Sequence, residues 1–389
     1  MVLLELLAPL TGIIRVRSKV NLDNMVFKLH YKVTAPMLFT FCLLVTTRNM
    51  TGDPINCVHD ENSKLNDDVV NTYCWVHTTY TLPKYLHRRS GHGTNIMYPG
   101  VGPASDNDER RYHAYYQWVP FVLFIQGMMF YVPHWIWRTV ENGKMDSLVA
   151  GLAVPVMRRE DRQEKISRLA EYLYASVHNH NFYAFKYFIC ELMTIAMTLF
   201  NMWFMDKFLG GMFYDYGFKV IEFTEMEQVD RTDPMIELFP RITKCDFNMF
   251  GPSGTIEKHD ILCVLAINVL NEKIYVFLWF WLLILATLSS LGFIYRLLIC
   301  CIPYLSIEFL SRRSLGKMSA VLTRQLQVGD RFILYVLRNN LELFCFTSLL
   351  EELTARLSGQ LRNHPDNDIT SEAAYMMNED IDIDRIITR

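Results

Sequence analysis

The segment from residue 274 to residue 295 is a run of 22 residues without a formal charge. An α-helix rises about 1.5 Å per residue, so a run of this length crosses a hydrocarbon core of about 30 Å. The chain has 389 residues, of which 51% are hydrophobic and 20% are charged, so its apolar residues are concentrated in segments of this kind. The sequence therefore predicts a membrane protein.

Three further segments have the length and hydropathy of membrane spans: residues 31–48, 114–137 and 183–205. The first contains Lys32 and Arg48 near its ends, where long basic side chains can reach the interfaces. The third contains Glu191, and a carboxylate within a span costs about 2.5 to 3.5 kcal/mol by insertion scales. We expect Glu191 to face other helices or water rather than lipid. The predicted fold is an all-α membrane protein with a bundle of four transmembrane helices.

The distribution of Lys and Arg predicts the orientation of these spans. Five basic residues lie in residues 1–32 and seven lie in residues 138–182, whereas the longer stretches 48–113 and 206–273 hold seven each. Because cytoplasmic segments carry the denser positive charge, both termini are expected in the cytoplasm and the two longer loops outside.

The expected organisation follows from the spans and their orientation. It runs as a cytoplasmic N-terminal segment (1–30), a first span (31–48), a first extracellular loop (49–113), a second span (114–137), a cytoplasmic loop (138–182), a third span (183–205), a second extracellular loop (206–273), a fourth span (274–301), a helical cytoplasmic C-terminal region (302–362) and a disordered tail (363–389).

Four of the nine cysteines fall in the two outer loops, with spacings of 17 and 18 residues. They are Cys57, Cys74, Cys245 and Cys263. An oxidising exterior makes them natural disulfide partners, although three pairings are possible and the spacing does not choose among them. The bridges are expected to fix the loops as a rigid outer platform.

The cytoplasmic segments carry signals for helices. Apolar residues recur at helical spacing from Ile166 to Val177, which predicts an amphipathic helix. A second helix is expected to begin near Asp330, and Ser348 with Glu351 has the form of a capping box that starts another. These helices would form a cytoplasmic dome.

Several functional classes are disfavoured. A net charge of −3 gives no basic surface for nucleic acid. No nucleotide-binding loop or nucleophile motif is present, so neither an enzyme nor a cofactor is predicted. His178 and His180 lack the further ligands that a metal site needs.

The entry to the second span holds the pentapeptide Tyr115-Tyr116-Gln117-Trp118-Val119, which resembles the signature of the innexins, the invertebrate gap-junction proteins. Other segments resemble innexins in the expected order, over roughly residues 20–340. They are Gly52-Asp53-Pro54-Ile55 before Cys57, Tyr73-Cys74-Trp75, His180-Asn181-Phe182-Tyr183, Pro240 with Thr243-Lys244-Cys245, Phe250 to Gly254, His259-Asp260 with Leu262-Cys263, and Asn271 to Trp281.

The resemblance implies a subunit of an oligomeric pore, with itself or with other innexins, in the plasma membrane at gap junctions. The ring would dock onto an apposed ring on the adjacent cell and pass ions and small metabolites. In that family the disulfides join the two loops from first to last, which here would pair Cys57 with Cys263 and Cys74 with Cys245. Membrane lipid is the other expected partner.

Two groups of residues are candidates to line the pore. The apolar amino terminus, with Val2, Leu3 and Leu6, could form a short helix that the family folds into the pore mouth, or a helix lying on the inner leaflet. In the first span Thr34, Met37 and Phe41 share one helical face, which could face the conduit or a packed bundle.

Two other functions remain compatible with four spans. An undocked large-pore channel of the related pannexin type would release small molecules from a single cell. A four-span transporter or receptor is the alternative from another class, but transporters show internal repeats or broken helices, and the fourth span is continuous.

Overall fold

The computed structural model describes residues 21–58, 66–86, 98–105, 107–149, 152, 158–225, 233–303, 305 and 325–363, with side chains to residue 359. Among these residues, four helical segments are long and apolar enough to cross a membrane: Met25–Thr51, Val119–Glu141, Asn181–Phe208 and Ala266–Cys301. This confirms the predicted four-span fold. The predicted amino-terminal helix and the predicted disordered tail, apart from Asn363, lie outside the described residues.

The chain divides into two compact units. One unit consists of Asp23–Thr139 and Ile189–Phe293, and the other of Met1–Leu22, Val140–Phe188 and Ile294–Arg389. We describe each by itself.

The first span contains a change of helical register. It begins with α2 (Met25–Lys28), continues as a π-helix, η1 (Leu29–Thr34), and becomes the regular helix α3 (Ala35–Thr51). Pro36 lies in the first turn of α3, where its missing N–H and its ring oppose a continuous α-helix from the preceding turn. The Thr34 hydroxyl donates to the Leu29 carbonyl at 3.0 Å, which satisfies a backbone acceptor within the wider turn.

The other spans are single helices: α5 (Val119–Glu141), α8 (Asn181–Phe208) and α11 (Ala266–Cys301). Glu191 in α8 is 4% exposed, and the Asn24 side-chain amide donates to its Oε1 at 2.6 Å. As expected, the carboxylate faces a neighbouring segment of the protein. Helix α11 begins eight residues before the predicted span, which started at Ile274.

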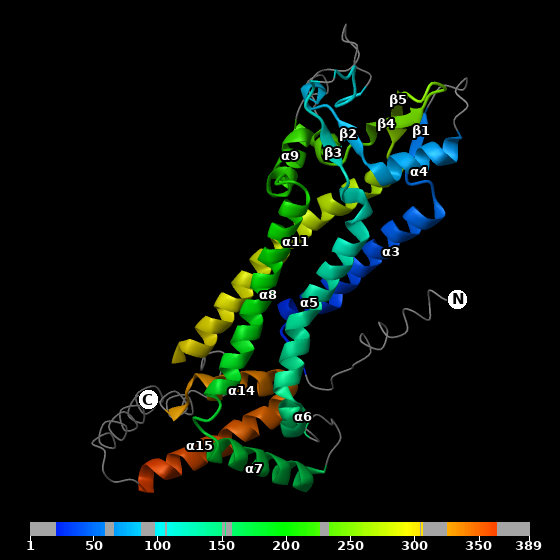
Figure 1. The fold of residues 1–389 in the computed structure, drawn as a ribbon. Helices are drawn as coiled ribbons and strands as arrows, with labels where there is room; N and C mark the ends of the chain where they lie inside the picture. The colour runs from blue at the N-terminus through cyan, green and yellow to red at the C-terminus, as the bar shows by residue number, and fades with distance from the viewer. Residues whose placement is uncertain are drawn as a thin grey trace. The chain divides into compact units, whose positions relative to one another are not determined.

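The two loops predicted to be extracellular form a sheet that the hydropathy pattern did not predict (Figure 1). In the described residues its five strands have the order β1-β5-β4-β2-β3, and every pairing is antiparallel. The strands are β1 (Asn56–Val58), β2 (Thr79–Thr81), β3 (Arg111–His113), β4 (Ile242–Phe250) and β5 (Ile256–Val264). Three of them have only three residues, which is too short for an alternating pattern to be recognised.

Short helices complete the loops. They are α4 (Asp67–His77), the 3₁₀ turns η2 (Pro83–Tyr85) and η3 (Tyr115–Gln117), α9 (Phe213–Glu225) and α10 (Pro234–Leu238). Side chains cap two of these helices: Asn66 accepts from the Asp68 amide at the start of α4, and Asp233 accepts from the Met235 amide at the start of α10.

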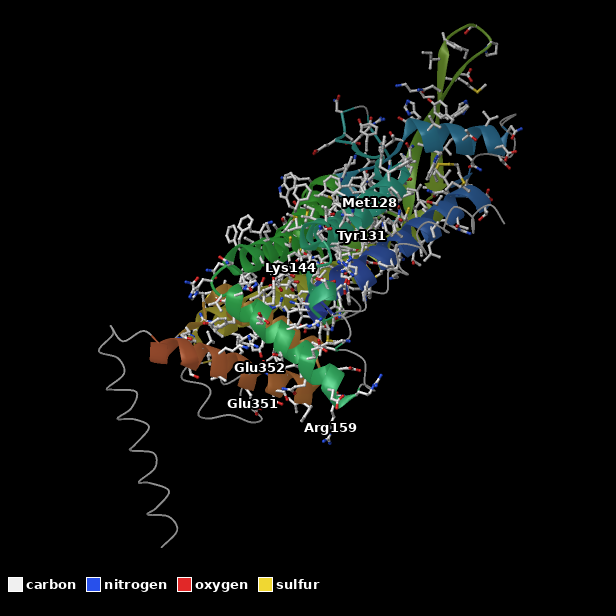
Figure 2. The ribbon with its side chains drawn as sticks, turned by 90° about the horizontal axis from the view of Figure 1, so that it is seen from below. Met128, Tyr131, Lys144, Arg159, Glu351 and Glu352 are labelled. Carbon is white, nitrogen blue, oxygen red and sulfur yellow. A yellow bond between two sulfur atoms is a disulfide. The ribbon has the colours of Figure 1, made fainter. Side chains whose placement is uncertain are left out.

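The other unit is helical where it is described. It contains α6 (Lys144–Val149), α7 (Arg159–Ala175), α14 (Val328–Asn340) and α15 (Leu343–Asn363), and helices α7 and α15 lie side by side (Figure 2). Helix α7 buries Ile166, Leu169, Ala170 and Leu173 of the predicted apolar stripe, but it ends at Ala175, before Val177. Glu352 of α15 accepts from Ser167 of α7 at 2.6 Å, which fixes the register of the two helices.

The start of α14 agrees with the prediction, but the capping box at Ser348 and Glu351 is wrong. Helix α14 begins at Val328, and the side chains of Gln327 and Asp330 cap each other's backbone amides. Ser348 and Glu351 instead lie inside α15, which begins at Leu343. A capping motif within an apolar-periodic stretch does not by itself end the preceding helical turns.

Asp330 also fixes the turn before α8. It is 5% exposed and accepts from His180 Nδ1 at 3.0 Å and from the His178 amide at 3.1 Å. Burial raises the pKa of this carboxyl, but the hydrogen bonds from His180 and from the amides of His178 and Gln327 lower it below its usual value, and the net shift is downward. Gly329 lies against the same turn, since a Cβ there would come within 2.3 Å of the Asn181 amide nitrogen.

We predict that Asp330→Asn lowers the stability of the purified protein by about 1–3 kcal/mol at pH 7, because three donors lose a charged acceptor. A carboxyl with a lowered pKa stabilises the fold above its unfolded-state pKa, and this contribution disappears as the pH falls through the folded-state pKa. The difference in Tm between the two proteins, measured by thermal unfolding in detergent, should therefore shrink from pH 7 to about pH 3.

The matched control is Asp161→Asn. Asp161 lies on α7 in an exposed pair with Arg158 at 3.6 Å, with 55% of its side chain exposed, and such pairs contribute little. Equal Tm losses for the two variants, or a loss for Asp330→Asn that does not change with pH, would contradict the assignment.

Candidate functional site: the disulfide-linked loop domain

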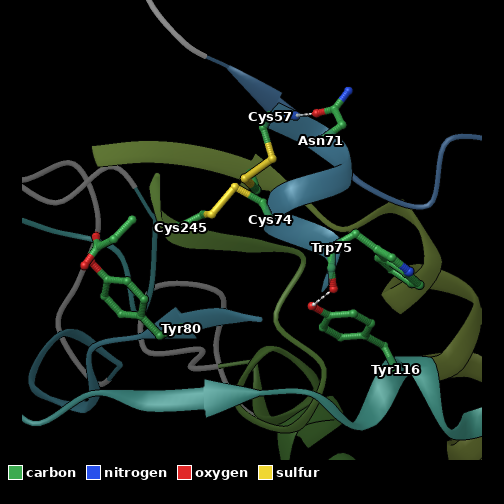
Figure 3. The surroundings of a disulfide bond; sticks show 9 residues. Cys57, Asn71, Cys74, Trp75, Tyr80, Tyr116 and Cys245 are labelled. Carbon is green, nitrogen blue, oxygen red and sulfur yellow. Dashed lines mark hydrogen bonds between the residues drawn. A yellow bond between two sulfur atoms is a disulfide. The ribbon is translucent and has the colours of Figure 1, made fainter. Parts of the chain in front are cut away.

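Two disulfide bridges join the first loop to the second. Cys57 is bonded to Cys263 and Cys74 to Cys245, with Cα–Cα distances of 4.0 and 5.8 Å. This is the pairing that the family resemblance implied. All four side chains are buried, and the sulfurs of Cys57, Cys74 and Cys263 lie within 4.8 Å of one another (Figure 3). Because these sulfurs are in disulfides, they offer no thiolate for a metal.

Strand and helix contacts position each bridge. Cys57 of β1 lies directly opposite Cys263 of β5, and the Cys57 amide donates to Asn71 Oδ1 of α4 at 2.8 Å. Cys74, on the buried face of α4, reaches Cys245 of β4. Bridges of this kind typically contribute about 2–4 kcal/mol, more for long closed loops. Those here span 206 and 171 residues.

The signature pentapeptide connects this domain to the second span. Tyr116 and Val119 are fully buried, and the Tyr116 ring packs on Trp75 with its centroid at 4.6 Å. The Gln117 side-chain amide donates to the Trp75 carbonyl at 2.5 Å. The Tyr116 hydroxyl donates to the same oxygen at 3.4 Å (Figure 3). Burial raises the pKa of Tyr116 to about 12, so its hydroxyl remains a donor. Trp75 adjoins Cys74, so the motif links α5 to a disulfide.

A second connection involves the start of α11. Asn268 donates to the Pro240 carbonyl at 2.7 Å, and the fully buried Glu272 accepts from Arg241 at 2.9 Å. Lys273 also donates to Glu272, at 2.6 Å. These contacts explain why α11 extends beyond the apolar run: its first two turns use polar side chains to fix the base of β4. In the sequence, Asn271, Glu272 and Lys273 were recognised only as part of the family resemblance. Their contacts with the base of β4 were not predicted.

Strands β4 and β5 extend beyond their neighbours as a two-stranded ribbon. The ribbon, which we call the distal hairpin, comprises residues 246–260. Its turn is closed by the Gly251 amide, which donates to Thr255 O at 2.8 Å, and Gly254 adopts a positive φ of 82°. Near the turn, Phe250 and Ile256 are cross-strand partners and are 77% and 63% exposed.

Polar contacts support the base of the distal hairpin. Asp246 accepts from the Tyr80 hydroxyl at 2.8 Å and from Arg110 at 2.5 Å. Lys244 pairs with Asp260 at 2.6 Å and donates to the Gly102 carbonyl at 3.0 Å. The first loop therefore holds the base of the ribbon through Tyr80, Arg110 and Gly102, and the apolar end of the ribbon projects from a fixed base.

Comparison with known proteins assigns this architecture. The family model described as Innexin matches residues 23–357. The chain belongs to the innexin family. Innexins are gap-junction channel proteins of the membrane rather than enzymes.

Individual innexins are similar to this one over nearly their full lengths. Innexin inx3 of Drosophila melanogaster is 45% identical over 92% of this chain and 91% of its own length. Innexin inx2 of Schistocerca americana is 41% identical over 92% of this chain and 99% of its own. Innexin shaking-B of Drosophila melanogaster is 39% identical over 93% and 97%.

The structure also places part of the pore candidates. Thr34 is fully buried in the protomer, and its Oγ1 accepts from Trp281 Nε1 at 2.9 Å. Met37 and Phe41 are partly buried, and the Phe41 ring meets Phe277 edge-on at 5.9 Å. Thr34 and Phe41 of the first span therefore pack against α11 of their own chain, and the pore-lining role of the three residues stays a prediction. Val2, Leu3 and Leu6 lie outside the described residues.

We predict that Gln117→Ala lowers the stability of this innexin by about 1 kcal/mol, because the carbonyl of the partly buried Trp75 loses its shortest hydrogen bond. The Tm of the purified oligomer and the amount of protein at the cell surface should both fall. Trp118→Ala is the matched control, since Trp118 is 59% exposed in the protomer. If the two variants have the same Tm, the signature does not act through Trp75.

Proposed function

We propose that this innexin forms oligomeric hemichannels whose disulfide-linked loop domains dock onto a matching ring on the adjacent cell. The docked pair forms a conduit for ions and small metabolites. The observation that carries this proposal is the loop domain itself, in which two disulfides and two polar connections hold an apolar-tipped ribbon in a fixed position. The rings are built from copies of this chain alone or together with other innexins.

The orientation in the plasma membrane rests on redox chemistry and charge. Disulfides form and persist in oxidising compartments, which supports an extracellular loop domain. The dense basic charge of residues 138–182 supports a cytoplasmic position for the segment that holds α6 and α7. With four spans, both termini are then cytoplasmic.

The distal hairpin is the proposed docking element. Phe250 and Ile256 expose apolar surface at its end, whereas Glu257 and Lys258 beside them carry charges of both signs. A surface with both signs suits contact with a second copy of itself. One hairpin buries little area, but a ring presents many hairpins at once, and multivalency raises the combined affinity.

We predict that Phe250→Asp abolishes electrical coupling between paired cells while dye uptake through undocked channels of single cells persists. The carboxylate would be desolvated at the contact without a partner. Phe250→Leu, which keeps the apolar surface, should retain coupling, and surface biotinylation should show equal delivery of both variants. Normal coupling with Phe250→Asp would exclude the hairpin as the docking element.

The same measurement tests the alternative of an undocked, pannexin-like channel. If the unsubstituted protein gives dye uptake in single cells but no conductance between paired cells, the gap-junction proposal fails. Nothing in the described part of the chain favours the alternative of a transporter or receptor.

For the conduit we propose that the amino-terminal segment lines its mouth, with Val2, Leu3 and Leu6 facing the lumen. Val2→Cys, Leu3→Cys and Leu6→Cys channels should lose current when a charged thiol reagent that permeates the pore is applied. The attached group would narrow the lumen, and its charge would repel permeant ions of the same sign. The parent channel, with its own cysteines, is the control. Unchanged current in all three would indicate a helix on the inner leaflet instead.

A further inference from the structure

An open apolar groove of about 440 Å³ lies among helices α9, α10 and α11. Its volume is within the range of about 300–1,000 Å³ that is usual for small-molecule sites. Six of the residues lining it are Val220 of α9, Met235 of α10, and Lys273, Val276, Phe280 and Ile284 of α11. Apart from the Lys273 amine, these are side chains of carbon and sulfur.

The position of the groove along α11 places it beside lipid. Val276 to Ile284 belong to the uncharged run 274–295, which defines the fourth span. Lys273 immediately precedes this run, only ten residues after the disulfide-bonded Cys263. The groove is therefore at the depth of the hydrocarbon in the leaflet nearest the loop domain, and Lys273 is at its boundary.

Helix α9 supports the same depth independently. Tyr214, Phe218 and Ile221 share one helical face and are 44%, 61% and 42% exposed. An apolar face of this kind on a short amphipathic helix is typical of helices that lie in the membrane interface.

Close packing fixes α9 against α11. A Cβ at Gly217 would lie 2.0 Å from the Trp279 ring, so only glycine allows this approach. Trp279 Nε1 also donates to the Tyr214 carbonyl at 3.1 Å. The wall of the groove is therefore preformed.

The mouth of the groove carries a cation beside carboxylates. The Lys273 side chain is 64% exposed and shares the Glu272 carboxylate with Arg241. Lys219 of α9 and Glu237 of α10 pair at 3.8 Å. The Lys273 amine donates to Glu272 and, at 3.9 Å, to Met235 Sδ, so this exposed amine keeps a further N–H for a phosphate.

We propose that this groove binds a phospholipid of the outer leaflet, with one acyl chain among Val220, Val276 and Ile284 and its phosphate on Lys273. A helix of a neighbouring subunit is the competing occupant. Helices that pack closely in membranes use small residues such as Gly, Ala and Ser, and the groove is lined by bulky side chains instead. A flexible acyl chain follows such a surface better than a helix does.

The proposal goes beyond the proposed function: it rests on the proposed orientation of the loop domain and on α11 spanning the bilayer, and it does not require docking. The test uses the purified full-length oligomer in nanodiscs that contain phosphatidylcholine with a photoactivatable diazirine in one acyl chain. After illumination, peptide mass spectrometry locates the labelled residues. Labelling should concentrate within residues 273–284 of α11 and on α9.

Two variants and a control define the site. Ile284→Trp fills the groove and should reduce labelling of this segment several-fold, and Lys273→Gln should reduce it by weakening retention of the headgroup. Leu291→Trp is the control, because Leu291 is 64% exposed on the same helix outside the groove, and its labelling pattern should match the parent protein. Size-exclusion chromatography verifies that each oligomer is intact.

Three results would overturn the proposal: no label on residues 273–284, equal labelling of the parent and Ile284→Trp proteins, or disulfide cross-linking of Ile284→Cys to a neighbouring subunit. The last would show that a second copy fills the groove. Labelling is scored on purified protein and does not depend on coupling between cells. Failure of the lipid proposal can therefore be told apart from failure of the gap-junction proposal.

Discussion

The loop domain depends on the two adjacent disulfides that join β1 and α4 to β5 and β4. Three-residue strands such as β1 and β3 bury little surface and form few ladder hydrogen bonds, so they do not persist as isolated pairs. The bridge between Cys57 and Cys263 closes a loop of 206 residues, which removes the large entropy that separate loops would retain. Once the cysteines are joined, β4 and β5 acquire neighbours on both sides, and their longer ladder can support a projecting hairpin.

A rigid platform is useful only if it is fixed to the spans. Here the connections are polar and short: Gln117 bonds Trp75 beside one disulfide, and Glu272 bonds Arg241 at the base of β4. Each connection joins the first turns of a span, α5 or α11, to the loop domain. Because both contacts are partly buried, displacement of either span would have to break a hydrogen bond or an ion pair that is shielded from water. The geometry of the hairpin is thus coupled to the positions of the helices.

The sequence predicted the features that depend on transfer of apolar residues from water into lipid. It missed those that depend on pairing between segments distant in the chain. Hydropathy located all four spans, and redox chemistry identified the outer cysteines, but the choice of partners required the family resemblance. The sheet escaped prediction because β1, β2 and β3 have three residues each, too few for an alternating pattern to be recognised. The start of α11 escaped because Asn268, Asn271 and Glu272 are polar, although each is fully buried. The capping box at Ser348 was wrong because a local capping signal does not interrupt a helix whose apolar face is packed.

Among the described residues, the disulfides lie in one of the two compact units, and the proposed topology supplies the reason. On the proposed outer side, covalent bonds between cysteines join the loops. On the proposed cytoplasmic side, where Cys345 is a free thiol, a reducing compartment excludes disulfides. There a buried Asp330 accepts from His180 and from two backbone amides and organises the starts of α8 and α14. Hydrogen bonds of this kind open and reform without a redox partner, whereas opening the disulfides of the loop domain requires a reductant.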